Sequence, residues 1–215
     1  MKPRIGVLTS GGDCPGLNAV LRGVVLAAEK LGWEVVGFRD GFEGLLPPGN
    51  RVILDRQSIN GIMALGGTII GTTNRGHFVA KVGAGDRTIV PKNIIAGAKK
   101  ILDELQVKAL IIVGGDGSMV TAQQLQETGI NCIGVPKTID NDLEATDYTI
   151  GFQTAVEVVV EAAETQSDWT SKWKAPRSPG ACLKVEPTSW SPKAPSMANR
   201  PSGTPFASSM APTSG

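Results

Sequence analysis

The sequence predicts a doubly wound α/β domain, in which helices cover both faces of a parallel β-sheet, and three observations support this fold class. Between residues 4 and 164, short apolar runs alternate with longer stretches of helical periodicity. Several of these runs end directly in polar or glycine-rich loops, as strands do at the ligand-binding edge of an open α/β sheet. The content of 41% apolar and 19% charged residues is ordinary for a soluble globular protein.

The first part of the chain contains a strand–helix–strand unit. Residues 4–8 and 34–38 are short apolar runs that suit buried strands. Between them, residues 18–31 place apolar side chains on one helical face, and Gly32 follows as a stop signal. Two strands joined by one helix imply a parallel pair with a right-handed crossover.

The same alternation continues along the chain. Residues 51–54 suit a short strand, and residues 59–65 suit one or two helical turns. Further helices are predicted at residues 91–105, from just after residue 118 to residue 125, and at residues 152–164, with strands at residues 109–113 and 130–135.

The composition changes after Glu164. Residues 165–215 contain eight of the 14 prolines but only three residues of the Leu/Ile/Val/Phe group. Three such residues cannot supply a core that offsets the entropy of the chain, so we expect a disordered tail here.

Charge and cysteine content exclude several classes of function. The net charge of +1 gives no global drive toward nucleic acid or an anionic membrane, and no apolar run approaches the length of a membrane span. Cys14, Cys132 and Cys182 are too few and too scattered for a zinc site or a disulfide framework. Because the N-terminus also lacks the apolar core of a signal peptide, we expect a cytoplasmic protein with reduced thiols.

Two glycine-rich loops follow apolar runs. Residues 11–16 (Gly-Gly-Asp-Cys-Pro-Gly) precede the first helix, whose free N–H groups would form an anion site; a plain tight turn is the alternative. This loop matches neither the Walker A motif nor the Gly-x-Gly-x-x-Gly motif. Residues 114–118 (Gly-Gly-Asp-Gly-Ser) carry Asp116 beside a helix start, which suits Mg²⁺ shared with phosphate oxygens. The alternative is a helix cap worth about 1 kcal/mol.

A second polar loop, residues 136–142 (Pro-Lys-Thr-Ile-Asp-Asn-Asp), follows the next strand and should emerge at the same sheet edge. Asp140 could accept the proton of a substrate hydroxyl during phosphoryl transfer, beside the cationic Lys137. An Asx-turn network that only shapes the loop is an equal alternative. Arg75 could clamp phosphate oxygens or be a solvated loop residue. His77, the only histidine, is interpreted as a surface loop residue.

With residues 9–18, 66–73 and 146–152, these loops resemble the 6-phosphofructokinase family in unbroken order from residue 2 to about residue 164. The resemblance implies transfer of the γ-phosphoryl group of ATP, with Mg²⁺, to the 1-hydroxyl of fructose 6-phosphate. It implies a two-lobe enzyme that forms homotetramers or homodimers. Residues 1–151 would form its Rossmann-like nucleotide-binding lobe, residues 152–164 the first helix of its second lobe, and residues 165–215 an irregular tail.

The resemblance also assigns roles to individual residues. ATP contacts are implied at Gly11, Arg75, Gly115, Asp116, Gly117 and Ser118, with Asp116 also the Mg²⁺ ligand. Asp140 matches the catalytic base and contacts the substrate, and Thr138 and Asp142 contact the sugar phosphate or shape its site. Arg22 resembles an effector-site arginine of regulated members.

The sequence departs from the family pattern in two respects. Members that use pyrophosphate carry Asp where Gly117 stands and Lys at position 137, so this mixed pattern favours ATP and keeps pyrophosphate open. The second lobe with its Met-Gly-Arg segment is not found, and the tail suggests a frameshift near residues 164–168. We therefore expect a chain that is cut short and has no appreciable activity, with a non-catalytic nucleotide-binding fragment as the alternative. Diacylglycerol-type lipid kinases and NAD kinases share the Gly-Gly-Asp-Gly loop but lack the segment at residues 138–142.

Overall fold

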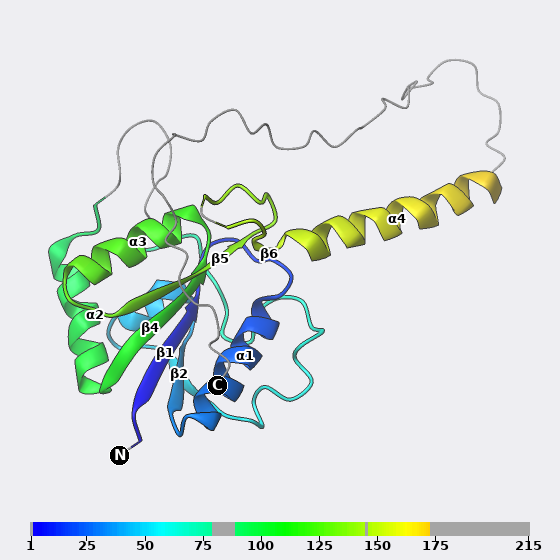
Figure 1. Ribbon diagram of the computed structural model, residues 1–215. Helices are drawn as coiled ribbons and strands as arrows, with labels where there is room; N and C mark the ends of the chain where they lie inside the picture. Colours follow the sequence, from blue (N-terminus) through cyan, green and yellow to red (C-terminus); the bar gives the residue numbers. More distant parts are fainter. Residues whose placement is uncertain (1, 79–88, 145, 173–215) are drawn as a thin grey trace, which may run out of the picture. The chain divides into compact units, whose positions relative to one another are not determined.

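The computed structural model describes residues 2–78, 89–144 and 146–172, which form a single α/β unit (Figure 1). Its sheet has six strands in the order β3-β2-β1-β4-β5-β6, the order of a doubly wound nucleotide-binding sheet. The strands are β1 (Arg4–Thr9), β2 (Glu34–Phe38), β3 (Arg51–Leu54), β4 (Val107–Gly114), β5 (Cys132–Thr138) and β6 (Ile150–Gly151). All neighbouring pairs are parallel except β2 and β3, which are antiparallel.

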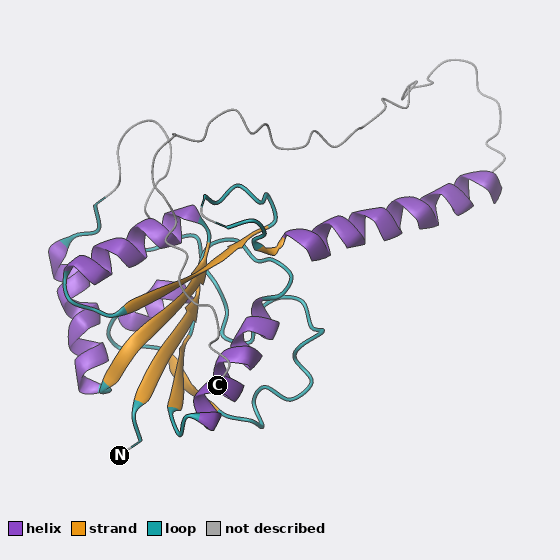
Figure 2. Cartoon of the chain, in the orientation of Figure 1, coloured by secondary structure: helices purple, strands orange, loops and turns teal. Residues whose placement is uncertain are grey.

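Helices cover both faces of this sheet, as predicted (Figure 2). Helix α1 (Leu17–Lys30) lies on one face, and α2 (Lys92–Glu104) and α3 (Asp116–Glu127) lie on the other. Alternate residues of the central strands β1, β2 and β4 divide between two buried clusters, because successive side chains point to opposite faces. On β1, Val7 packs with the α1 cluster and Leu8 packs with the α2 and α3 cluster. The doubly wound fold class is therefore confirmed.

Several boundaries differ from the predictions. Strand β3 runs antiparallel, and the two-residue β6 was not predicted. Residues 59–65 form turns rather than helix. Strand β5 continues through Pro136, which can be accepted there because β6 begins to pair with β5 only at Lys137. Helix α3 begins at Asp116 because the carbonyl of Gly115 accepts the N–H groups of Ser118 (3.0 Å) and Met119 (3.1 Å).

The last described helix, α4 (Phe152–Lys172), continues past the predicted end at Glu164. Its predicted apolar face is largely uncovered by the described residues, and Val159 is 67% exposed. The predicted tail falls largely on residues 173–215, which lie outside the described residues. None of the described helices is long and apolar enough to cross a membrane.

Candidate active site

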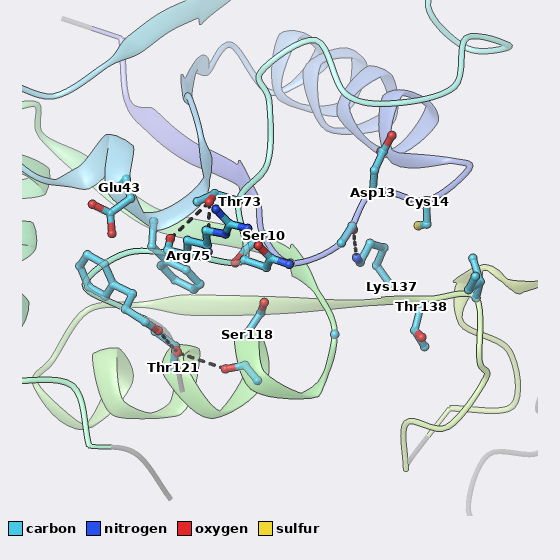
Figure 3. A pocket seen from close by; sticks show the side chains of 18 of the residues that line it. Ser10, Asp13, Cys14, Glu43, Thr73, Arg75, Ser118, Thr121, Lys137 and Thr138 are labelled. Carbon is cyan, nitrogen blue, oxygen red and sulfur yellow. Dashed lines mark hydrogen bonds between the residues drawn. The ribbon is translucent and has the colours of Figure 1, made fainter. Parts of the chain in front are cut away.

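The site lies where β1 and β4 run side by side and their connections leave toward opposite faces of the sheet. The N–H of Ser10 donates to the carbonyl of Val113 (2.9 Å), which joins the two strand ends. Such a switch point leaves a crevice at the carboxyl edge of the sheet. It holds a cavity of about 410 Å³ (Figure 3). The cavity is lined by residues 10–14, 42, 43, 73–75, 78, 115, 117, 118, 121 and 137–140.

Side-chain hydrogen bonds fasten the loop at residues 66–73 to the end of β1 and the start of α1. Thr9 donates its hydroxyl to the carbonyl of Gly71 (2.7 Å), and Thr72 donates its hydroxyl to the carbonyl of Gly11 (2.8 Å). Asn18, which is 2% exposed, donates to the carbonyls of residues 65 and 66 and accepts the N–H of Ile69 (2.9 Å). These motif residues therefore hold the cavity wall in place rather than facing a ligand.

Glycine is required where the two strand ends approach each other. A Cβ on Gly114 would collide with the side chain of Ser118 and would lie 3.2 Å from the carbonyl oxygen of Ser10. Gly11 has a φ of +89°, and a Cβ there would lie 3.6 Å from Nζ of Lys137. Backbone and cationic groups can thus approach a ligand closely at this end of the cavity.

Lys137 is a buried cation at the cavity wall. The side chain is 5% exposed, and its ammonium group donates to the carbonyl of Gly12. Among the described residues, no carboxylate lies within ion-pair distance of it. A buried charge without a counter-ion is costly, and an anionic ligand would remove that cost. The sequence showed the charge of Lys137 but gave no sign of its burial.

The loop after β5 is shaped by Asn141 and Thr149. The side-chain oxygen of Asn141 accepts the N–H of Thr149 (2.9 Å), and the Thr149 hydroxyl donates to the carbonyl of Thr138 (2.7 Å). The Thr138 hydroxyl accepts the N–H of Asp140 (3.1 Å). An Asx network does shape this loop, and the side chain that forms it belongs to Asn141 rather than to Asp140 or Asp142. Asp140 lines the cavity with an exposed side chain.

Seven of the nine predicted site residues line the cavity: Gly11, Arg75, Gly115, Gly117, Ser118, Thr138 and Asp140. Asp116 and Asp142 are exposed; Asp116 stands between the lining residues Gly115 and Gly117, and Asp142 stands two positions after Asp140. Asp116 is the first residue of α3. The N-cap residue of this helix is Gly115, and no side chain caps the helix by a hydrogen bond. Arg22 lies elsewhere, where its Nη1 donates to the carbonyl of Ile59 (3.2 Å).

A magnesium ion fits this arrangement only with help from a ligand. The described residues contain no group of three or more His, Cys, Asp or Glu side chains that could hold a metal ion by themselves. Asp116 offers one exposed carboxylate between two cavity-lining glycines. Mg²⁺ is commonly bound by one or two carboxylates together with water and substrate phosphate oxygens, so the donor set suits a phosphate-bound ion.

The helix that opens onto the cavity is α3 rather than α1. Gly115, Gly117 and Ser118 at the start of α3 line the cavity, whereas the first residues of α1, Leu17 and Asn18, are buried and do not. The backbone N–H groups that could meet an anion at a helix start are therefore those of α3.

Sequence reasoning missed the aromatic end of the cavity. Phe42 and Phe78 are stacked, with ring centroids 5.4 Å apart and an interplanar angle of 25°. Both rings line the cavity, as does the carboxylate-bearing Glu43. The two phenylalanines are distant in sequence, Phe42 in the short 3₁₀ helix η1 (Gly41–Leu45) and Phe78 in a turn, so no periodicity in the sequence indicated that they meet.

Cys14 also lines the cavity and is buried. Burial raises the pKa of the Cys14 thiol; the nearby Lys137 ammonium acts against this rise and the Asp13 carboxylate adds to it. Because the neutral thiol is favoured, Cys14 is a weak nucleophile at neutral pH and serves as a packing residue against β6.

Comparisons with known proteins are consistent with this geometry. The family model described as phosphofructokinase matches residues 4–172. The ATP-dependent 6-phosphofructokinase of Chloroflexus aggregans is 48% identical over 163 residues, which cover 76% of this chain and 45% of the relative. The enzyme of the same name from Buchnera aphidicola is 46% identical, covering 80% of this chain and 50% of the relative. The chain spans about half the length of the curated relatives it matches.

Solved structures give the same result. Phosphofructokinase of Pichia pastoris in the T-state superposes with a TM-score of 0.64 at 30% identity, covering 77% of this chain and 18% of that chain. A pyrophosphate-dependent phosphofructokinase from Nitrosospira multiformis shares the fold, with a TM-score of 0.65 at 23% identity over 79% of this chain and 42% of that chain. On the fold, the ordered motifs and these similarities, the chain belongs to the phosphofructokinase family.

Proposed function

We propose that this chain forms the ATP–Mg²⁺ half of a 6-phosphofructokinase, which transfers the γ-phosphoryl group of ATP to the 1-hydroxyl of fructose 6-phosphate. The observation that carries the proposal is the composition of the cavity. It joins a cationic end, where Lys137 lies beside Gly11 and Ser118, to an aromatic end made by Phe42 and Phe78. A nucleotide triphosphate has the same two-part character, with an anionic chain and a flat apolar base.

The phosphate end would stabilise charge through groups that are already in place. Lys137 supplies a buried positive charge, and the backbone N–H groups at the start of α3 supply the field of a helix N-terminus. Asp116 would hold the Mg²⁺ ion, which when bound supplies neutralisation of phosphate charge. Positioned charges of this kind account for most of the catalysis in phosphoryl transfer.

Asp140 would act as the general base. Its carboxylate would accept the proton of the sugar 1-hydroxyl while the hydroxyl oxygen forms its bond to the γ-phosphorus and the bond from that phosphorus to the departing ADP breaks. Its exposed position in the cavity wall leaves the carboxylate accessible to a substrate. Thr138, which orients the backbone of Asp140, and Asp142 would contact the sugar phosphate or shape its site.

Pyrophosphate is the second candidate phosphoryl donor, and the burial of Lys137 is the observation in its favour, because pyrophosphate presents only anionic groups. The stacked Phe42 and Phe78 favour ATP instead, since pyrophosphate has no base to use them. Glycine at position 117 also leaves room beside the phosphate chain. We therefore rank ATP first.

The wider proposal includes fructose 6-phosphate as the acceptor, a homo-oligomer of this chain, and a cytoplasmic location. The described residues assigned to the sugar phosphate are only Thr138, Asp140 and Asp142. Misplacement of a reacting group by about 1 Å can cost a factor of about 100 in rate. We therefore expect this 215-residue chain to bind nucleotide without appreciable turnover of fructose 6-phosphate.

Calorimetric titration of the full chain tests the proposal. ATP with Mg²⁺ should bind saturably and more tightly than either pyrophosphate with Mg²⁺ or adenosine. Removal of Mg²⁺ should weaken ATP binding in the parent chain, and an Asp116→Asn variant should lose most of that dependence. No saturable binding of ATP with Mg²⁺ would refute the proposal, and tighter binding of pyrophosphate would transfer it to the second candidate. A coupled assay that showed normal turnover would refute the expected inactivity alone.

A further inference from the structure

The segment at residues 73–78 forms one wall of the cavity and is fastened at its two ends. At the first end, the N–H of Gly11 donates to the carbonyl of Thr73 (3.0 Å). At the second end, the hydroxyl of Thr121 donates to the carbonyl of Phe78 (3.2 Å). Arg75 stands between these ends, is exposed, and lines the cavity. Its side chain makes no ion pair among the described residues, so its position depends on how the backbone around it is held.

Two side chains hold that backbone. The hydroxyl of Thr73 accepts the N–H of Arg75 (3.1 Å) and donates to its carbonyl (3.3 Å). Glu43, the third residue of the short 3₁₀ helix η1 (Gly41–Leu45), holds the residues that follow. One carboxylate oxygen of Glu43 accepts the backbone N–H of His77 (2.6 Å), and the other lies 2.9 Å from Nδ1 of the same residue. Both oxygens of a single carboxylate thus engage one residue. A pair of this kind fixes orientation as well as distance.

Gly76 leaves room for the contact between Glu43 and His77. It has a φ of +120°, and a Cβ at this position would collide with the carboxylate of Glu43. The approach of Glu43 to His77 therefore requires glycine between Arg75 and His77. The sequence Arg-Gly-His at residues 75–77 and the glutamate at residue 43 form one local unit, although 34 positions separate Glu43 from His77.

The pairing also directs the charge of Glu43. This carboxylate lines a cavity for which we propose a polyanionic ligand, and an unpaired carboxylate there would repel phosphate. In the observed arrangement both of its oxygens face His77. The negative charge is thereby used to hold the loop that carries the positive charge of Arg75.

From these contacts, we infer that Glu43 and His77 are a positioning pair, which holds Arg75 at the cavity mouth so that its guanidinium group meets the phosphate chain of the nucleotide. The inference rests on the proposed function, because it assigns to Arg75 a phosphate group of a bound nucleotide. It adds two residues that touch no ligand themselves and act through Arg75.

Titration of the full chain with ATP and Mg²⁺ gives the first part of the test. His77→Ala should weaken binding by about fivefold, since it removes one of the two contacts to Glu43. Glu43→Ala should weaken binding by about tenfold, since it removes both contacts. Glu43→Gln retains an acceptor for the His77 N–H and should remain within about twofold of the parent.

The coupling to Arg75 separates positioning from general loosening of the fold. In an Arg75→Ala background, His77→Ala should cause a clearly smaller loss of ATP affinity than in the parent, because the group that it positions is absent and only repulsion by the freed Glu43 oxygen remains. Glu29→Ala is the matched control, as it breaks a surface ion pair with Arg56 (2.9 Å) away from the cavity. It should leave ATP affinity unchanged.

Each outcome bears on the inference in a definite way. If Arg75→Ala weakens binding and His77→Ala causes the same loss with or without Arg75, the positioning role is overturned while the nucleotide site stands. If Glu43→Ala binds ATP as the parent does, the positioning role is equally overturned. If the parent chain does not bind ATP with Mg²⁺ at all, the proposed function fails together with the inference.

Discussion

Replacing Lys137 by methionine should weaken the binding of phosphate-bearing ligands while stabilising the free protein. The change removes the buried charge and keeps an unbranched side chain of similar length. At an effective dielectric constant of about 20, a unit charge about 4 Å from a phosphate oxygen contributes roughly 4 kcal/mol. Desolvation of the two groups offsets roughly half of this, which leaves about 2 kcal/mol, or about a 30-fold loss of ATP affinity.

The stability of the free protein should change in the opposite direction. Without a ligand, the ammonium group of Lys137 has only the Gly12 carbonyl as a hydrogen-bond partner among the described residues. Replacing an uncompensated buried charge by an apolar side chain commonly stabilises a fold, here by about 1 kcal/mol. Urea denaturation of both chains without ligand measures this difference.

The titration requires three ligands and one matched variant. ATP and pyrophosphate should both lose affinity in Lys137→Met, whereas adenosine, which has no phosphate, should bind as it does to the parent. Lys99→Met is the control, because Lys99 also donates to a backbone carbonyl, that of Thr128 (2.8 Å), but lies outside the cavity. An equal loss for ATP and adenosine, or no loss for ATP, would refute the assignment of Lys137 to the phosphate chain.

Three further predictions follow from the site. Gly114→Ala should lower the free energy of unfolding in urea by about 2 kcal/mol, because the added methyl collides with Ser118, whereas Gly12→Ala, with open space at its Cβ, should not. Asp140→Asn should leave ATP affinity within about twofold in calorimetric titration, because the proposed general base meets the sugar hydroxyl rather than the nucleotide. Burial raises the pKa of the Cys132 thiol from 9.0 to about 11, so its contribution to stability is full below pH 9 and is lost as pH rises to about 11. Cys132→Ala should therefore lose less stability than the parent over that pH range, as measured by thermal unfolding.

The alternating pattern of the sequence was sufficient for the fold class because the long helices are periodic and the central strands are continuous apolar runs. Helix α1 and strand β2 were located within one or two residues, since apolar residues mark their buried faces and Gly32 follows the helix. The direction of β3 and the existence of β6 were not accessible in the same way. Both strands are short, and each is recognised only by its pairing with a neighbouring strand. So few residues do not show in the sequence which strand they pair with or in which direction.

Only part of the candidate site could be predicted from the sequence. The loops that carry Gly11, Gly115 and Asp140 were found because glycine and carboxylate residues after apolar strands are unusual. The burial of Lys137 and the contact between Glu43 and His77 depend on segments that meet only in the folded chain. Their sequence neighbours give no hint of these contacts, because charged residues in loops are solvated in most proteins.

The short strand β6 has a consequence for the order in which the site is assembled. It pairs with β5 at Lys137 and Thr138, and its Ile150 carbonyl accepts the thiol of Cys14 (3.6 Å), a residue 136 positions earlier. A Cβ on Gly151 would lie 2.8 Å from the sulfur of Cys14, so this close approach of the two segments requires glycine. Contacts of such long sequence separation form late in folding. During synthesis, the glycine loop that follows β1 can make its contacts with β6 only after residue 151 has been made. Nucleotide binding by a growing chain should therefore begin only after residue 151 has been made.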